Sequence, residues 1–398
     1  MKYAFVTPRY GLEVLGGAEL GARMIAERLV ERLGWSVEIF TSCALDSITW
    51  ADHYPAGDEV LNGVAVHRFP TVAGRPPEFF PFSERVLSAP RAATLAEAWQ
   101  FIDLQGPGCP DLLEALGASD ARLFAFYPYL YTPTVRGLPL VAERAIMHPA
   151  AHDEPAIHLP VFRETMRAAK GFVFQTSSER AFVQRLFGVA HVPEILLGLG
   201  VDESFAESFV SRSEPVSRAD PVSLGDRPYL LCLGRVDGLK GTTMLAELFA
   251  VYKERNPGPL ALVMAGPVSA TPPAHPDLIL AGPVSEEDKW ELLAGALALV
   301  SPSPHEAFSI VLMEAWTAGL PVVVNGRCAA TREHCERSGG GLWFSSYPEL
   351  EVVLDRIAAN ASLRAALAEA GRRYVQANYT WPVIIDRYAS FVERLAGA

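Results

Sequence analysis

Two glutamates with the spacing E-x7-E lie in the stretch from Ser301 to Val324, "SPSPHEAFSIVLMEAWTAGLPVVV". These residues are Glu306 and Glu314, and carboxylates are good hydrogen-bond acceptors for the hydroxyl pairs of sugars. A helix that begins at about Phe308 would place Glu314 on the order of 9 Å farther along its axis. The two carboxylates could therefore hydrogen-bond hydroxyl groups on either side of a bound diphosphate.

The usual alternative for glutamates on a helix is simple solvation. Apolar residues surround Glu314 in the sequence, from Ile310 to Met313 before it and Trp316 after it, which weakens that alternative. The strand-like run "ALALVSP" comes first, and the first free backbone N–H groups of the helix would lie near Ser309 and Ile310. A helix N-terminus of this kind favours a bound phosphate.

A basic loop follows another strand-like run, "PYLLC". In "LGRVDGLKG" the residues Arg235 and Lys240 stand in a loop flanked by glycines. Ligands of open parallel sheets bind outside the carboxyl ends of the strands. Two cations at such a place suit a diphosphate, which arginine can bind through two N–H groups at once. Surface basic residues are common, however, so the loop alone is a modest indication.

The first loop of the chain, "TPRYGLEVLGGAELG", contains adjacent glycines, Gly16 and Gly17, at the expected start of a helix. Adjacent glycines let the backbone approach a ligand closely, and the helix N-terminus favours an anion. The loop does not match G-x-G-x-x-G, so the dinucleotide-binding motif is absent. A flexible surface turn explains this loop equally well.

Two histidines, His148 and His152, follow the strand-like run "RAIM" and precede Asp153 and Glu154. Histidine is well suited to orient or polarise a reacting sugar near neutral pH. A hydrogen-bonded structural histidine is an equally good interpretation of either residue. A metal site is possible, but the spacing supplies no third ligand. The chain also lacks a D-x-D triplet.

The elements that would position these residues alternate between short apolar strands and amphipathic helices, the pattern of parallel α/β sheets. One predicted helix carries an apolar stripe from Leu20 to Leu33, and the segment from Thr71 to Leu87 is predicted to be a loop or insertion. Residues 203–227 are polar and rich in Pro and Ser, as expected of a linker. We expect a domain at 1–203, a second at 204–380, and a terminal helix at 381–398 that belongs to the first.

Composition excludes several classes of protein. The chain has 398 residues and a net charge of −12, so binding to nucleic acid is not expected and membrane contact would be peripheral at most. The five scattered cysteines form no C-x-x-C pair. We find no signal peptide and no run of about 18 apolar residues. These features predict a cytoplasmic protein.

Taken together, the loops resemble the GT-B-fold retaining glycosyltransferases, specifically glycosyltransferase family 4. The resemblance extends over nearly the whole chain. It consists of the Gly-Gly loop, the R-x-x-x-x-K-G pattern of Arg235, Lys240 and Gly241, the segment "GPVSEEDKWELLAGA", the E-x7-E pair, and a helix near Trp381. It implies two Rossmann-like domains whose parallel sheets face each other across a cleft, with the C-terminal helix crossing back to the N-terminal domain.

The resemblance also implies roles for individual residues. Catalysis would fall to the residues nearest the transferred sugar and the leaving diphosphate, namely His152, Glu306, Arg235 and Lys240. The donor site would contain Gly16, Gly17, Arg235, Lys240, Val284, Glu306, Phe308, Ser309, Ile310 and Glu314. Family members often have glycines where this chain has Ala307 and Ser309, which bears mainly on the identity of the sugar.

The expected substrates are a nucleoside-diphosphate sugar, such as a UDP- or GDP-linked hexose, and an acceptor glycan, lipid-linked sugar or small molecule. The resemblance implies transfer with retention of configuration and without a metal or other cofactor. Two alternatives stay open: a GT-B phosphorylase or nucleotide-sugar hydrolase, and a non-catalytic partner that binds sugar nucleotides.

Overall fold

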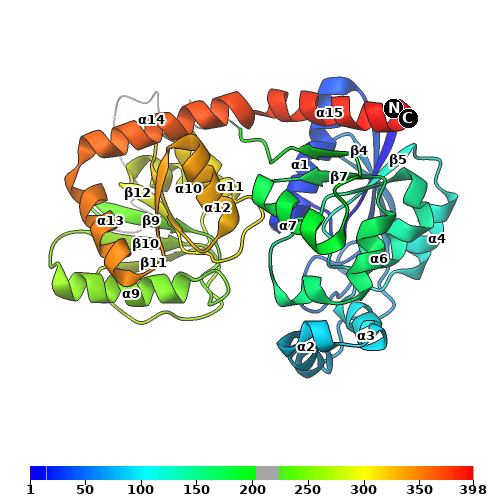
Figure 1. Cartoon of the computed structure of the whole chain (residues 1–398), viewed down its shortest axis with the longest axis horizontal. Coiled ribbons are helices and arrows are strands. Elements are labelled where there is room, and N and C mark those ends of the chain that lie inside the picture. Colours follow the sequence, from blue (N-terminus) through cyan, green and yellow to red (C-terminus); the bar gives the residue numbers. More distant parts are fainter. Residues whose placement is uncertain (15, 203–223, 226, 398) are drawn as a thin grey trace. The chain divides into compact units, whose positions relative to one another are not determined.

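The computed structural model describes residues 1–14, 16–202, 224–225 and 227–397. The chain forms two compact units. Unit 1 contains Met1–Gly198 and Ile384–Ala398, and unit 2 contains Leu199–Val383. Nearly all of the predicted linker, residues 203–227, lies outside the described residues. Each unit is built around one sheet with helices packed against it (Figure 1).

The sheet of unit 1 has eight strands in the order β3-β4-β2-β1-β5-β6-β7-β8. The strands are β1 (Lys2–Val6), β2 (Ser36–Ser42), β3 (Gly57–Leu61), β4 (Val64–Phe69), β5 (Leu123–Phe126), β6 (Ala145–Met147), β7 (Gly171–Phe174) and β8 (Glu194–Leu196). Every neighbouring pair is parallel except β3 and β4.

The exception is a hairpin that the sequence pattern did not predict. Asn62 and Gly63 join β3 to β4 with φ angles of 49° and 81°. Two positive φ angles in a two-residue loop suit an antiparallel hairpin, and Asn-Gly is the preferred pair there. The hairpin could not be recognised because the residues of β3, GDEVL, are mostly exposed at the sheet edge and so show no apolar pattern.

The helices of unit 1 connect and cover these strands. They are α1 (Gly17–Leu33), α2 (Phe79–Ser88), α3 (Leu95–Gln105), α4 (Pro110–Ala118), α5 (Thr132–Gly137), α6 (Val161–Ala168) and α7 (Ser177–Phe187), with 3-10 turns η1 (Pro90–Ala92), η2 (Leu138–Arg144) and η3 (Pro155–His158). The prediction of a loop over the Pro- and Phe-rich segment was wrong in part, because α2 lies within it. Phe79 and Val86, seven residues apart, are buried on one face of this helix, and Pro81 lies in its first turn, where proline is tolerated.

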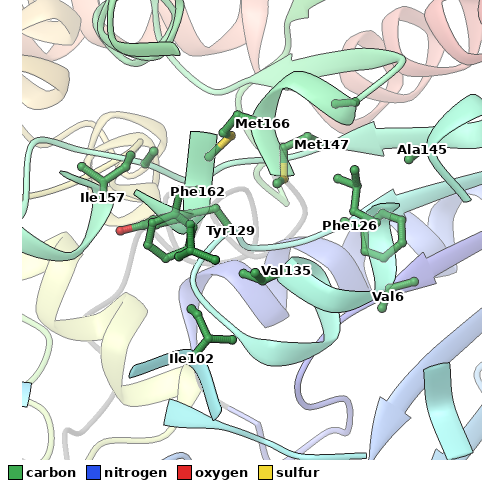
Figure 2. Close-up of a cluster of buried hydrophobic side chains, with 14 of the residues drawn as sticks. Val6, Ile102, Phe126, Tyr129, Val135, Ala145, Met147, Ile157, Phe162 and Met166 are labelled. Carbon is green, nitrogen blue, oxygen red and sulfur yellow. The ribbon is translucent and has the colours of Figure 1, made fainter. Parts of the chain in front are cut away.

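The core of unit 1 lies between its sheet and the helices α3 to α6. Val6 and Phe126, on neighbouring strands, pack in a cluster with Met147 and Phe162, and all four are fully buried. Figure 2 shows this cluster around Tyr129 and Val135. The buried strands hold their carboxyl ends, and the loops that follow them, in fixed positions.

The sheet of unit 2 has six strands, all parallel, in the order β11-β10-β9-β12-β13-β14. The strands are β9 (Tyr229–Leu233), β10 (Ala261–Ala265), β11 (Leu278–Gly282), β12 (Ala298–Ser301), β13 (Val322–Asn325) and β14 (Gly341–Phe344). The helices are α9 (Thr242–Arg255), α10 (Glu286–Gly295), α11 (Ile310–Thr317), α12 (Ala329–Ser338), α13 (Tyr347–Ala359) and α14 (Ala361–Asn378). The expected class, α/β with two parallel sheets, is confirmed.

The last helix, α15 (Trp381–Gly397), returns the chain to unit 1. Its Tyr388 hydroxyl lies 2.7 Å from the hydroxyl of Tyr3 on β1 and 2.9 Å from Nε2 of His148. The Arg122 guanidinium donates to the Ala396 carbonyl near the end of the chain. The helix therefore docks on the N-terminal unit, as expected. Among the described helices, none combines the length and apolar character needed to span a membrane.

Candidate functional site

The basic loop after β9 is organised by Asp237. Its carboxylate accepts a hydrogen bond of 2.7 Å from the Lys240 backbone N–H, while its own N–H donates to the Thr242 hydroxyl at 2.7 Å. Asp237 Oδ2 also lies 3.4 Å from Nε of Arg235, whose side chain is 55% exposed. The loop thus has a fixed backbone but leaves an accessible guanidinium at the carboxyl end of the strand.

Gly241 closes this loop and begins α9. Its φ of 69° is in the left-handed region, and a Cβ there would lie 2.6 Å from the Pro302 carbonyl oxygen. Both facts require glycine. The close approach brings the β9 loop against the loop after β12, so the K-G part of the pattern has a direct structural cause.

These two loops are joined by an ion pair. Lys240 Nζ lies 2.7 Å from Glu306 Oε1, with both side chains partly buried. The structure therefore brings together Lys240 and Glu306, and Arg235 lies in the same loop as Lys240. A lysine ammonium has three N–H donors, so Lys240 can keep this contact and still donate to a ligand oxygen.

The helix after Glu306 starts two residues later than predicted. α11 begins at Ile310, and its N-cap Ser309 has φ 72° and ψ 79°. Ser309 cannot be the first residue of a right-handed helix in that conformation. Phe308 is buried against the rings of His334 and Tyr379, so the loop is anchored just before the free N–H groups of α11. Those N–H groups lie at the carboxyl end of β12.

Glu314, one turn into α11, is engaged by a residue that the sequence analysis did not single out. Its Oε1 accepts a hydrogen bond of 2.8 Å from Lys289 Nζ, and its side chain is only 13% exposed. Burial raises the pKa of Glu314, against the lowering effect of the Lys289 ammonium. The E-x7-E carboxylates thus each have a separate lysine partner.

Lys289 lies in the first turn of α10. This helix follows β11, and the half-buried Val284 lies in the short loop between them. The Ser285 hydroxyl caps this helix by accepting from the Asp288 N–H at 3.1 Å. The S-x-x-D pattern in "VSEEDKW" could have placed Lys289 one turn inside a helix. Its contact with α11 could not be found that way, because the two helices are separated in the chain.

The Gly-Gly loop of unit 1 surrounds a buried ion pair. Arg9 Nε donates to Glu19 Oε1 at 3.0 Å, and Glu19 is 5% exposed. A Cβ on Gly16 would lie 2.2 Å from the Glu19 carboxylate, whereas one on Gly17 would meet nothing within 4 Å. Gly16 therefore makes room for the ion pair, and Gly17 leaves open space at the N-terminus of α1.

His148 is placed as a structural histidine. It is buried beneath α15, with Nε2 2.9 Å from the Tyr388 hydroxyl and its ring 5.0 Å from that of Tyr127. Burial lowers the pKa of His148 to about 3, so the ring is neutral at physiological pH. The side chain is used to attach the C-terminal helix.

His152 lies in the loop after β6 with a partly exposed side chain, 3.6 Å from Glu154 Oε2. Tyr129 donates to the other Glu154 oxygen at 2.6 Å. The same loop is fixed by Glu179, which accepts from the Ala151 N–H at 2.8 Å. Burial raises the pKa of Glu179 to about 7, opposed by hydrogen bonds from backbone N–H groups.

The predicted residues fall into two groups. Gly16, Gly17 and His152 belong to unit 1, and the remaining predicted site residues belong to unit 2. Within unit 2, three loops and their helices (after β9, β11 and β12) carry two cation–carboxylate pairs and a helix N-terminus. Across the described residues, no three His, Cys, Asp or Glu side chains are grouped as metal ligands. The arrangement suits a ligand with both phosphate oxygens and hydroxyl pairs.

Known proteins resemble this chain in sequence. Residues 213–374 match the family described as glycosyl transferases group 1. The D-inositol 3-phosphate glycosyltransferase of Saccharomonospora viridis is 25% identical over 93% of this chain and 87% of that protein. The match to the same enzyme of Kineococcus radiotolerans, at 27% identity, covers 43% of this chain and only 42% of the relative.

Another relative is the GDP-mannose-dependent alpha-(1-6)-phosphatidylinositol monomannoside mannosyltransferase of Mycobacterium tuberculosis, 26% identical over 63% of this chain and 70% of that protein. Among solved structures, sucrose-phosphate synthase from Thermosynechococcus elongatus superimposes with a TM-score of 0.70 at 16% identity, covering both chains completely. This structural similarity confirms the expected GT-B fold.

Proposed function

We propose that this chain, of which residues 213–374 match the glycosyl transferases group 1 family, transfers a hexose from a nucleoside-diphosphate sugar to an acceptor hydroxyl in glycan or glycoconjugate synthesis. The observation that carries the proposal is the pairing of Lys240 with Glu306, on the loops after β9 and β12, and of Lys289 with Glu314, on α10 and α11. These pairs supply cations for a diphosphate and carboxylates for hydroxyl groups. The GDP-mannose dependence in the name of one relative supports a donor of this class.

The diphosphate would be held by the guanidinium of Arg235, the ammonium of Lys240 and the N–H groups at Ser309 and Ile310. Gly17, at the open N-terminus of α1, would offer a backbone N–H group to an anion. These groups are preorganised hydrogen-bond donors, which stabilise the charge that develops on a leaving group. They would supply that charge stabilisation without a bound metal.

The carboxylates would accept hydrogen bonds from the hydroxyl groups of the donor. Glu314 would accept from the ribose hydroxyls, and Glu306 would accept from the transferred sugar. The base would lie beside Val284, and the partly exposed His152 is proposed to contact the transferred sugar. The Phe308 backbone would complete the sugar site.

Transfer would retain the configuration at the anomeric carbon. The bond between that carbon and the diphosphate oxygen breaks, and the acceptor oxygen bonds to the same face. The acceptor proton passes to an oxygen of the leaving diphosphate. No side-chain nucleophile is needed, because Arg235 and Lys240 stabilise the leaving group directly.

An activity assay tests this proposal. The protein is incubated with UDP- and GDP-hexoses and a panel of glycan, lipid-linked and small-molecule acceptors, and the release of nucleoside diphosphate and the anomeric configuration of the product are measured. Lys240→Ala and Glu314→Ala should each lower turnover about 10²- to 10³-fold, the usual loss for one transition-state donor, with unchanged circular dichroism.

Arg255→Ala is the matched control, because it removes a cation at the last residue of α9, about 20 Å along the helix from the end that follows the Lys240 loop. This arginine is 62% exposed and pairs with Glu351. Near-normal turnover in both Lys240→Ala and Glu314→Ala would contradict the assignment. Product formation that requires inorganic phosphate and no nucleotide would instead favour a phosphorylase. Tight nucleotide binding without turnover would favour a non-catalytic partner.

A further inference from the structure

Lys289 stands at the centre of a charge cluster that includes Glu314, the carboxylate proposed to bind the ribose. Its ammonium lies 2.8 Å from Glu314 Oε1 and 2.7 Å from Glu286 Oε2. The lysine is 16% exposed and Glu314 is 13% exposed, whereas Glu286 is 68% exposed. Lys289 therefore joins one buried carboxylate to one at the surface.

Three charged groups act on the Glu314 carboxylate. Lys289 and Glu286 come from α10, and Asp202 lies in the segment after β8. Two of these three are acidic and disfavour a charge on Glu314. Lys289 is the cation of the three, and its charge opposes the rise in the pKa of Glu314 that burial and the two acidic groups cause.

We infer that Lys289 is a positioning residue for the donor site: its ammonium keeps the buried Glu314 ionised and aims the carboxylate toward the ribose of a nucleoside diphosphate. The inference rests on the function proposed above. An ionised carboxylate offers only acceptors, whereas a protonated one loses part of that capacity and presents a donor. Recognition of a hydroxyl pair needs the ionised form.

The tertiary contact sets the direction of the effect. Burial raises the pKa of Glu314, and the contact with Lys289 lowers it. Burial alone would lower the pKa of Lys289, but Glu314 and Glu286 outweigh this and raise it, so the lysine is charged wherever the carboxylate titrates. Removal of the ammonium therefore raises the pKa of Glu314 further. As the pH is lowered, nucleotide binding should then begin to weaken at a higher pH than in the wild type.

The test is a calorimetric titration of UDP and GDP into wild-type, Lys289→Met, Lys289→Arg and Glu286→Gln proteins between about pH 5 and pH 8. As the pH is lowered, the nucleotide affinity of Lys289→Met should begin to fall at a higher pH than that of the wild type. At low pH the loss should be about tenfold for each unit by which the pKa of Glu314 rises. Lys289→Arg keeps the charge and should retain the wild-type profile. Glu286→Gln removes a like charge and should shift the profile to lower pH.

An unchanged profile in Lys289→Met, or tighter binding at every pH, would overturn the inference, because Lys289 would then only compete for Glu314. Absence of any nucleotide binding by the wild type would instead refute the proposed function. In that case the carboxylic-acid C=O band of the ligand-free protein still tests the lysine. The band should be stronger in Lys289→Met than in the wild type, and this increase should be absent from Lys289→Met/Glu314→Gln, which carries no buried unpaired charge.

Discussion

At the scale of single residues, Ser309 occupies a backbone conformation that usually requires glycine. A serine occupies a backbone conformation with φ 72°, where a Cβ is unfavourable by about 1–2 kcal/mol. The conformation places the N–H groups of α11 at the end of β12. The loop geometry associated with glycine is thus kept although the glycine itself is absent.

Ser309→Gly should therefore raise the free energy of unfolding or leave it unchanged. The relief of about 1–2 kcal/mol is offset by the entropy of glycine in the unfolded chain, about 0.5–1 kcal/mol. Ser309→Ala keeps the Cβ and should give no relief, which makes it the matched control. Urea unfolding followed by tryptophan fluorescence measures both. A glycine variant less stable than the alanine variant would contradict the argument.

The residue types at the site could be predicted because parallel sheets bind ligands in the loops after their strands. Arg235, Lys240 and Glu306 were found in this way, and the structure brings Lys240 into contact with Glu306. Lys289 could not be recognised from its position, since its partner is 25 residues away on another helix. The conformation of Ser309 and the burial of His148 also depend on tertiary packing.

At the scale of elements, α15 is attached to unit 1 by polar contacts inside an apolar interface. The Tyr388 hydroxyl contacts the Tyr3 hydroxyl and His148 Nε2, and Ile384, Ile385 and Val392 are fully buried beside it. The amphipathic pattern predicted the helix and its apolar face. It could not predict the three-membered network, whose residues lie far apart in the sequence.

Tyr388→Phe should lower the free energy of unfolding of unit 1 by about 1–3 kcal/mol. The substitution removes two hydrogen bonds of about 0.5–1.5 kcal/mol each and leaves buried partners unsatisfied. Tyr347→Phe, on α13 of unit 2, loses only a 3.2 Å contact with Glu351 and should be nearly neutral. Chemical denaturation compares the two variants. Equal stability of Tyr388→Phe and the wild type would show that the network contributes nothing.

Strands and helices with strong apolar periodicity were predicted well, and weakly patterned ones were not. The buried runs such as "YLLCL" and "ALVMA" are β9 and β10. The edge strand β3 has mostly exposed residues, and the three-residue β8 is only partly buried, so neither carries a clear hydrophobic signal. The helix α2 was not predicted because the prolines in and before it are typical of loops.

At the scale of the whole molecule, an acidic chain is proposed to bind an anionic ligand. The net charge of −12 is unfavourable for such a ligand at long range, although salt screens this effect beyond about 8–10 Å. Binding must therefore come from local cations and N–H groups at the ends of the strands. We therefore assign diphosphate binding to Lys240 and Arg235 rather than to a general basic surface.

The most direct measurement is the thermal melting of the protein with UDP, GDP, ADP and dTDP, each with and without EDTA. A nucleotide at 100 times its dissociation constant adds about 2.7 kcal/mol of stability. We expect one of the diphosphates to raise the melting temperature of the wild type and of Arg255→Ala equally, with or without EDTA. Lys240→Ala should lose most of that shift. A wild type that no diphosphate stabilises, or a Lys240→Ala variant that is stabilised as fully as the wild type, would contradict the account.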